Sequence, residues 1–196
     1  METNSILQGL IENRRSTKPA EMNGKIIPNE HIQQLIGLAN WAPTHGRTEP
    51  WRFVVYEQAA KQQFCHDHAE LYKNNTDPEK FMQGKYEKLR QQADLLSHIV
   101  IVYMKRSIGS NIPALEETAA TAAAIQNFLL GAQAMGIAAL WSTGGMTHHP
   151  AMKNYLNLHE EDIVLGLLFL GYTDEAPKPG KRMIPVEEKV IWRSGR

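Results

Sequence analysis

The amino-acid sequence predicts one α+β domain, and three observations lead to this fold class. The chain has 196 residues, a common length for a single domain with a substantial core. Segments with apolar residues at helical spacing alternate with short apolar runs that are typical of buried strands. The apolar fraction is 42% and the charged fraction 21%, which are ordinary values for a folded protein and argue against a disordered chain.

The first half of the chain alternates predicted helices with one strand. The expected elements are helices over 5–16 and 29–39, a strand over 52–56, and helices over 58–74 and 77–96. Ser5 and Asn29 are candidate N-caps, because short polar side chains satisfy free amides at a helix start. Asp77 followed by Pro78 indicates another helix start, since proline suits the first helical position.

The second half contains the predicted core strands and a long helix. The expected elements are strands over 98–104, 137–142 and 163–172, a helix over 113–136, and a short helix within 147–158. The 113–136 helix consists largely of alanine, so another helix can approach it closely. That neighbour is either in the core of the same chain or on a symmetry mate in a dimer. The tail over 173–196 has three prolines and ends in an apolar cluster, Val190 to Trp192, which favours contact with a partner subunit.

Charge, cysteine content and hydropathy exclude several classes of protein. Lys plus Arg equals Asp plus Glu at 21 each, so the chain lacks the basic balance of a nucleic-acid-binding protein. No run of about 18 apolar residues could span a membrane, and the charged N-terminus does not resemble a signal peptide. Cys65 is the single cysteine, which suits a reducing compartment. We therefore expect a cytoplasmic protein with no nucleic-acid or membrane partner.

Three short segments carry groups suited to a flat polar ligand. WAPTHGRTEPWRF (41–53) places prolines, tryptophans and a histidine in one helix-to-strand connection. Trp141-Ser142-Thr143-Gly144-Gly145 follows a predicted strand, and its glycines allow close backbone approach. Arg14-Arg15-Ser16 is explained either by cations at a helix C-terminus or by a phosphate site, since the arginine fork matches phosphate oxygens. Together the segments favour ligand-binding loops.

The histidines do not predict a metal site. His66 and His68 are two positions apart on a predicted helix and point away from each other, so we assign both to a solvated polar face. His148 and His149 open a short helix without further nominated ligands. The sequence also lacks a Ser/His/Asp set, paired carboxylates, a Walker motif and a GxGxxG loop, so hydrolase chemistry has no support. We expect no metal.

The ordered combination of ENRRS, APTHGRTEPWRF, a small-residue helix and GIAALWSTGG resembles the nitroreductase-like FMN flavoproteins. The likeness is to the small subgroup with an RRS…APxHxxxxPW…W-x-S pattern, although here Ser142 follows Trp141 directly. It covers essentially the whole chain, so residues 1–196 are expected to form a single nitroreductase-like FMN-binding domain. The resemblance implies a mixed central sheet flanked by helices, in an intertwined homodimer with FMN at the subunit interface.

The resemblance also implies an activity and a set of site residues. Such proteins pass a hydride from NADH or NADPH through FMN to an electron-poor acceptor, of the nitroaromatic or quinone type, in ping-pong fashion. Arg14, Arg15 and Ser16 match the motif for the phosphate, ribityl chain and pyrimidine edge. The other matching positions are Trp41, Pro43, Thr44 and His45 in the loop from the second subunit, Trp141, Ser142 and Thr143 in the third segment, and Lys181 or Arg182 near the phosphate.

Several points stay open at this level. No catalytic residue is nominated, because hydride chemistry belongs to the flavin. Ser142, Thr143 or the backbone after them are equal candidates for the contact with N5 of the ring. Arg47 differs from the small or uncharged residues of close relatives, and it suits an anionic acceptor or the phosphate of NADPH. Alternative functions are a flavin store or sensor without turnover, an FMN enzyme of the same fold with different reductive chemistry, and a non-flavin interaction domain.

Overall fold

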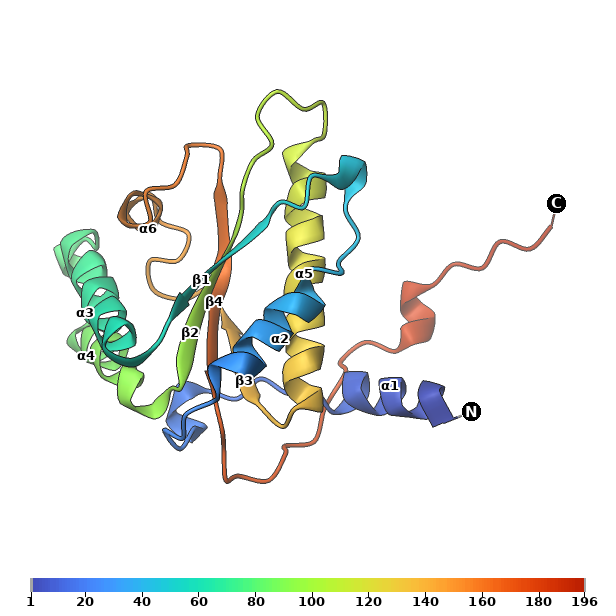
Figure 1. The fold of residues 1–196 in the computed structure, drawn as a ribbon, viewed down its shortest axis with the longest axis horizontal. Helices are drawn as coiled ribbons and strands as arrows, with labels where there is room; N and C mark the ends of the chain where they lie inside the picture. Colours follow the sequence, from blue (N-terminus) through green and yellow to red (C-terminus); the bar gives the residue numbers. More distant parts are fainter. Residues whose placement is uncertain (1, 196) are drawn as a thin grey trace.

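The computed structural model describes residues 2–195, which form a four-stranded sheet with helices on both faces (Figure 1). The strands are β1 (Trp51–Tyr56), β2 (His98–Met104), β3 (Ala138–Ser142) and β4 (Ile163–Gly171). The α-helices are α1 (Glu2–Asn13), α2 (Asn29–Ala39), α3 (Gln58–Asn74), α4 (Gln83–Gln91), α5 (Ala114–Ala134) and α6 (Pro150–Tyr155). The α+β prediction is confirmed.

The sheet has the strand order β1-β2-β4-β3. Its three ladders are antiparallel, with Val54 opposite Ile101 between β1 and β2 as one example. A mixed sheet, with parallel and antiparallel pairs, was expected. In the part of the chain that the structure describes, the only parallel pair is the bridge between Ser16 and Ala139. This bridge lies on the outer edge of β3, so it brings the segment after α1 to the border of the sheet.

Two hydrophobic cores occupy the two faces of the sheet. Successive side chains along a strand point to opposite faces. Val100 and Val102 of β2 therefore pack with α2 and α5, whereas Ile99 and Ile101 pack with Phe64 of α3 and its neighbours. Burial of both faces explains why β2 and β4 are continuous apolar runs in the sequence.

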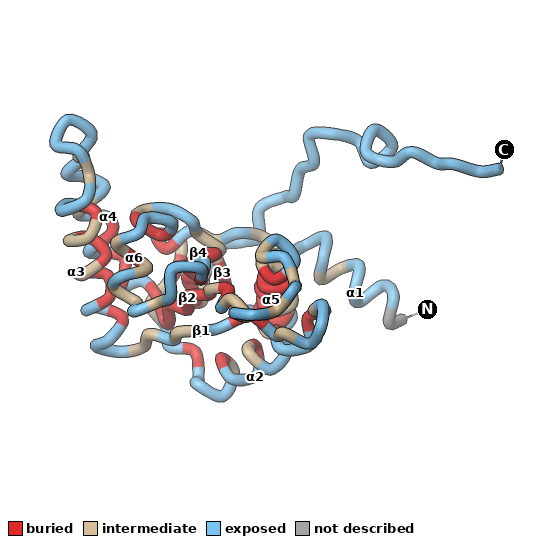
Figure 2. Tube along the Cα trace, turned by 90° about the horizontal axis from the view of Figure 1, so that it is seen from above, coloured by how far each residue is buried: buried red, intermediate tan, exposed pale blue. Residues whose placement is uncertain are grey.

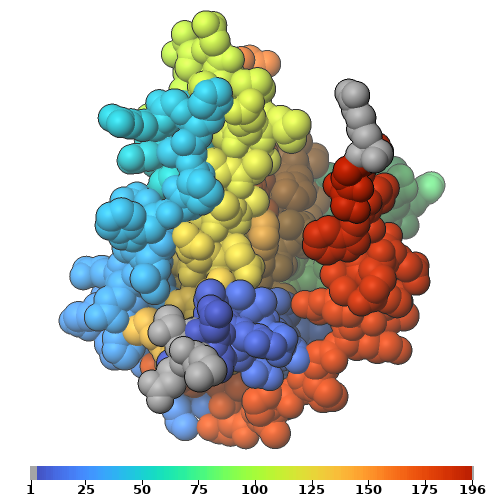
Figure 3. Space-filling view, turned by 90° about the vertical axis from the view of Figure 1, so that its right-hand side faces the viewer, coloured from blue at the N-terminus to red at the C-terminus, as the bar shows by residue number. Residues whose placement is uncertain are grey.

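Helix α5 packs closely on α2 through a small residue. A Cβ placed on Gly131 would lie 2.6 Å from a methyl group of Leu38 and 2.9 Å from one of Leu35, so glycine allows the two helices to touch. Part of α5 faces solvent: Leu115 in its first turn is 79% exposed, and Ala119 and Gln126 are also exposed. Figure 3 shows this helix, in yellow, at the molecular surface between the cyan segment that precedes β1 and the blue α1. Burial of one side in its own chain leaves the other side available to a partner.

The helix predicted over 77–96 is interrupted. Asp77 accepts a hydrogen bond from the Glu79 amide and caps a 3-10 turn, Pro78–Lys80, but α4 begins only at Gln83. The cause is tertiary, because the ring of Phe81 stacks on Tyr72 with 5.5 Å between centroids and the Met82 amide donates to the Tyr72 hydroxyl over 3.0 Å. These contacts hold the connecting backbone extended.

Two other predicted helix starts also differ. Helix α1 begins at Glu2 rather than at Ser5, and Pro28 occupies the N-cap position of α2. Asn29 instead uses its side chain for tertiary contacts: its amide donates to Glu57 over 2.8 Å, and its carbonyl oxygen lies 3.0 Å from His98 Nε2.

Helix α1 and the C-terminal tail stand apart from the body of the molecule (Figure 2). Their large apolar side chains are mostly exposed, with Trp192 at 89%. The other exposed members are Ile6, Leu7 and Ile11 of α1, and Met183, Ile184, Val186, Val190 and Ile191 of the tail. Within the described residues, no helix is both long and apolar enough to cross a membrane.

Candidate functional site

The segment that follows α1 is held along the outer edge of β3. Helix α1 ends at Asn13, and three residues later Ser16 pairs with Ala139 in the parallel bridge. The Thr17 amide donates to the Ala139 carbonyl over 3.0 Å. The predicted first and third site segments are therefore neighbours in space, although more than 120 residues separate them in the sequence.

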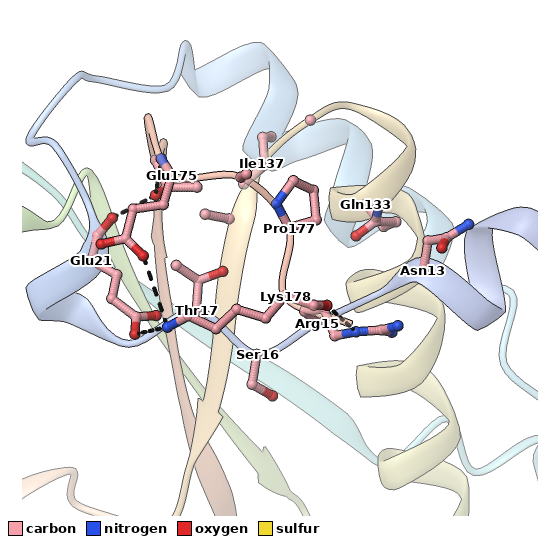
Figure 4. Close-up of a pocket in the computed structure, with 14 residues that line it drawn as sticks. Asn13, Arg15, Ser16, Thr17, Glu21, Gln133, Ile137, Glu175, Pro177 and Lys178 are labelled. Atoms are coloured by element: carbon pink, nitrogen blue, oxygen red, sulfur yellow. Dashed lines mark hydrogen bonds and ion pairs between the residues drawn. The ribbon is translucent and has the colours of Figure 1, made fainter. Parts of the chain in front are cut away.

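The side chains of Ser16 and Thr17, beside the edge strand β3, point to opposite faces of the sheet. Paired residues of a ladder share a face, and so do residues two apart on one strand. Ser16 therefore lies on the face of Ala139 and Trp141, while Thr17 points the other way. Figure 4 shows the side chains of Ser16 and Thr17 directed to opposite sides. Ser16 is exposed, so its hydroxyl is accessible on the Trp141 side.

Arg14 and Arg15 have different surroundings. The guanidinium of Arg15 donates to the backbone carbonyls of Lys178 (2.9 Å), Glu12 (2.6 Å) and Arg14 (2.8 Å). Arg14 is half-buried, and its guanidinium has no hydrogen-bond or ion-pair partner among residues 2–195. Of these two predicted phosphate ligands, Arg14 is thus the one with uncommitted donors.

A cavity of about 310 Å³ opens beside Arg15. Its walls come from the end of α5, the start of β3 and the base of the tail (Figure 4), and it includes Ser16, Gln133 and Glu175. Lys178 forms an ion pair with Glu21 across one wall, and this hydrogen bond lowers the pKa of Glu21 below its usual range. Of the predicted site residues, Arg15 and Ser16 line this cavity and the rest lie outside it.

Trp141 forms a fixed wall at the end of β3. Its indole Nε1 donates to the Leu165 carbonyl over 3.0 Å. A Cβ on Gly166 would lie 2.1 Å from this nitrogen, so the ring lies directly over the β4 backbone. The adjacent Ser142 accepts a hydrogen bond from the Gly144 amide over 3.3 Å, and Thr143 is exposed. The Trp141 donor is therefore used internally, and its ring offers an apolar surface.

The glycine turn after Thr143 is held by His68, and the prediction of a solvated polar face for this residue is wrong. His68 is not solvated: it is 1% exposed, and its Nε2 accepts the Met146 amide proton over 2.9 Å. Burial, with a smaller contribution from Lys85, lowers the pKa of His68 to about 4. The helical stripe of Phe64, Cys65, His68, Ala69 and Tyr72 was the available signal, because these positions share one face of α3.

The predicted 41–45 loop is exposed and internally bonded. Trp41 is 86% exposed, and Pro43 also faces solvent. The Thr44 hydroxyl lies 3.1 Å from that of Thr48, and His45 Nδ1 is 2.6 Å from a carboxylate oxygen of Glu116. These contacts fix the loop against the start of α5.

The backbone just after the 41–45 loop has unusual conformations. Arg47 has φ 55° and Glu49 has φ 42°, and neither is glycine. Left-handed conformations of such residues cost on the order of 1–3 kcal/mol and concentrate at functional sites. Arg47 is exposed, and its guanidinium has no hydrogen-bond or ion-pair partner in the described chain.

The 41–45 loop and the Arg14–Ser16 segment lie at opposite ends of α5 (Figure 1). His45 contacts Glu116 in the first turn of the helix, whereas Gln133 in its last turn lines the cavity with Arg15. With a rise of 1.5 Å per residue, these ends are about 25 Å apart. One protomer does not bring the two predicted segments together.

Lys181 and Arg182 are exposed residues of the tail, just beyond its contact with Arg15. A Cβ on Gly180 would lie 2.1 Å from one Arg15 nitrogen and 2.5 Å from the guanidinium carbon. The tail backbone therefore passes directly over Arg15 before the two basic residues follow. Arg182 donates to the Lys181 carbonyl over 3.3 Å.

His148 and His149, for which no metal role is predicted, contact the backbone near them. His149 Nδ1 accepts the Ala151 amide proton over 3.1 Å and caps α6, and His148 Nδ1 lies 3.0 Å from the Val164 carbonyl oxygen. Within residues 2–195, no three His, Cys, Asp or Glu side chains are grouped to hold a metal ion.

Comparison with known proteins gives a consistent set of relatives. The "Nitroreductase family" model matches residues 11–172. The Bacillus subtilis protein YfhC, named "Putative NAD(P)H nitroreductase", is 25% identical over 186 residues, which cover 94% of this chain and 93% of YfhC. A nitroreductase-like family protein from Bacillus cereus has a TM-score of 0.80 at 26% identity and covers 96% of both chains. The FMN-dependent nitroreductase NfnB from Mycobacterium smegmatis, solved with NADPH, has a TM-score of 0.74 at 15% identity, with 98% and 100% covered. At that identity the likeness to NfnB concerns the fold alone.

Proposed function

The chain belongs to the nitroreductase family, and from this membership we propose that it is an FMN-dependent NAD(P)H oxidoreductase that uses residues 1–196 as one FMN-binding domain. Bound FMN supplies the hydride chemistry, between NADH or NADPH and an electron-poor acceptor of the nitroaromatic or quinone type, in a ping-pong sequence. The protein supplies binding, orientation and a controlled environment. A cytoplasmic location is part of this proposal, since a single free thiol, Cys65, suits a reducing compartment.

The observation that carries the proposal is the grouping at the edge of β3. Arg14 offers guanidinium donors that no described residue uses, and a phosphate dianion matches that fork. Ser16 presents an accessible hydroxyl on the same face as Trp141, whose ring is held rigidly by Leu165. The following Gly144 is exposed and lets a ligand approach the backbone closely. A cation, a hydroxyl, a flat wall and a glycine turn together fit the phosphate, ribityl chain and ring of FMN.

The proposed site takes its second wall from another copy of the chain. The 41–45 loop is about 25 Å from Arg15 within one protomer, measured along α5, so a site that uses both needs two chains. Exposed apolar side chains on α1, on the free side of α5 and on the tail support an intertwined homodimer. The complete proposed set is Arg14, Ser16, Trp141, Ser142 and Thr143 of one chain, with Arg15 holding the tail beside them, Trp41, Pro43, Thr44 and His45 of the other, and Lys181 or Arg182.

The assembly is tested by mass in solution. The chain has a mass of 22.1 kDa, so light scattering of the wild type is expected to give about 44 kDa, twice that value. Asp in place of both Ile191 and Trp192 should weaken the dimer and lower FMN retention together, because both side chains are more than 80% exposed in the protomer. A wild type of 22 kDa that still binds FMN tightly would contradict the two-chain site.

The function is tested by the visible spectrum of the purified protein after addition of FMN and removal of the excess. Anaerobic NADPH and then NADH are added in turn. We expect a retained flavin band that bleaches with at least one nucleotide and returns on addition of a nitroaromatic or quinone. Retained flavin that is not bleached would indicate a store or sensor, and bleached flavin that neither acceptor reoxidises would indicate different reductive chemistry. Absence of retained flavin would reject the proposal.

A further inference from the structure

We propose that His68 is a positioning residue for the flavin site, acting on the turn formed by residues 144–147. This inference rests on the proposed function, because it assigns the turn a role beside bound FMN. His68 is buried on α3, in a region packed with Met146, whereas Trp141 packs with the core cluster of α2 and α5. His68 therefore acts through the turn backbone rather than on a ligand.

The first support is the hydrogen bond from the Met146 amide to His68 Nε2, 2.9 Å long. Since Nε2 accepts, the proton of the neutral ring is on Nδ1, and one tautomer is selected. The pKa of about 4 keeps the ring neutral at ordinary pH, so the acceptor is available.

The second support is direct contact between the ring and Gly145. A Cβ at this position would lie 2.4 Å from His68 Nε2 and 2.7 Å from Cε1. Gly145 also has φ 68°, a left-handed conformation that favours glycine. The turn backbone therefore lies against the imidazole, and the ring limits how far the turn can move toward α3.

Hydrogen bonds inside the turn fix its shape rather than its place. The Thr147 hydroxyl donates to the Gly144 carbonyl over 2.6 Å, and the Gly144 amide donates to Ser142 over 3.3 Å. These bonds are all within residues 142–147. Outside them, the Met146 side chain packs with Ala69, Tyr72 and Leu89. His68 adds a hydrogen bond, which has a defined direction, to this apolar packing.

His68 also carries an energetic cost that an apolar residue would avoid. Its Nδ1 is buried and has no hydrogen-bond partner among the described residues. A buried donor without a partner destabilises a protein by the full cost of its desolvation. Leucine would fill similar space without that donor, so the bond to Met146 is what distinguishes histidine here.

The test compares His68→Leu and His68→Gln with His66→Leu, a control two residues away whose side chain is half-exposed. His68→Leu is expected to weaken FMN binding and lower kcat/KM, each by roughly 10–100-fold, as for a displaced positioning group. It should also shift the flavin midpoint potential and reduce hydrogen-exchange protection of the Met146 amide. Glutamine can accept the same amide proton, so His68→Gln should recover part of each loss.

A double-mutant cycle tests the contact itself. Gly145→Ala should weaken FMN binding, because its methyl group overlaps the His68 ring. His68→Ala is the second single variant of the cycle. In the double variant, His68→Ala with Gly145→Ala, the overlap is removed, so the loss of FMN affinity should be smaller than the sum of the losses in the two single variants.

The inference is overturned if His68→Leu lowers the melting temperature while FMN affinity, midpoint potential and kcat/KM match the wild type. Strict additivity in the cycle would also overturn it. These results differ from failure of the proposed function, in which the wild type itself would retain no FMN, and the role of His68 would be rejected with it.

Discussion

Arg15 donates from its Nε to the backbone carbonyl of Lys178, 163 residues further along the chain, over 2.9 Å. The same guanidinium contacts the Gly180 backbone and two carbonyls at the end of α1. Arg15 therefore joins the N-terminal helix to the base of the tail. Its neighbour Arg14 has no such partner among residues 2–195, so the two adjacent arginines of one motif have different roles.

Arg14→Ala is expected to weaken FMN binding by roughly 10- to 100-fold, the range for loss of a charge-assisted hydrogen bond worth about 1.5–3 kcal/mol. Arg15→Ala should act mainly on the tail, because its donors are bound to carbonyls. Fluorescence titration with FMN gives the first effect, and limited proteolysis of the tail gives the second. Equal losses of FMN affinity in the two variants, without faster tail cleavage in Arg15→Ala, would contradict this division.

Gly180→Ala should loosen the tail, because its methyl group would displace the Arg15 guanidinium from the Lys178 carbonyl. Loss of one such bond is worth about 1 kcal/mol, or about a fivefold weaker dimer if the tail embraces a partner. Sedimentation at several concentrations measures the change. Gly84→Ala is the matched control, since a Cβ there meets nothing within 4 Å. A similar shift in both variants would refute the specific role of Gly180.

The free energy of unfolding is expected to fall as pH drops from 6.5 toward 4. Burial holds the pKa of His68 at about 4 in the folded chain, against an ordinary 6.5. The unfolded chain therefore binds a proton in this window that the folded chain does not, and stability present above pH 6.5 is lost below it. A shift of this size corresponds to on the order of 3 kcal/mol.

Urea unfolding at pH 7 and pH 4.5 checks this expectation. His68→Leu should lose less stability between the two values than the wild type does, and His66→Leu should follow the wild type. His98, whose pKa burial also lowers, remains in all three proteins and supplies a common background. Identical losses in all three would show that His68 does not titrate in this way.

Arg47→Ala is expected to act on anionic ligands. Arg47 lies two residues after the 41–45 loop that is proposed to cover the flavin, and its guanidinium has no hydrogen-bond or ion-pair partner within residues 2–195. The KM of an anionic ligand should rise severalfold, and that of a neutral acceptor should not change. Comparing nitrobenzoate with nitrobenzamide, and NADPH with NADH, identifies whether the acceptor or the nucleotide provides the anion. Equal effects on charged and neutral ligands would leave the charge of Arg47 without a role in specificity.

Local patterns predicted most elements, and one case shows the limit of such patterns. The apolar run of β2 and the spacing of α3 match the structure, because the period of a helix or strand depends on residues within a few positions. Asp77 and Pro78 also start a 3-10 turn, as expected for an N-cap residue followed by proline. The turn does not continue into a helix, because Phe81 stacks on Tyr72 and the Met82 amide donates to the Tyr72 hydroxyl. A local sequence pattern does not predict these contacts.

The sequence by itself determined the α+β class, the order of the elements and the three segments that resemble a flavin site. Only the tertiary structure decided that Ser16 pairs with Ala139 and that Arg15, rather than Arg14, donates to the Lys178 carbonyl. It also decided that the buried His68 accepts the Met146 amide proton and supports the turn. The physical reason is the range of the interactions. Secondary structure follows from backbone geometry and side chains a few residues apart, whereas each of these pairings joins residues 78 to 163 positions apart, through contacts that exist only once the sheet and helices have packed.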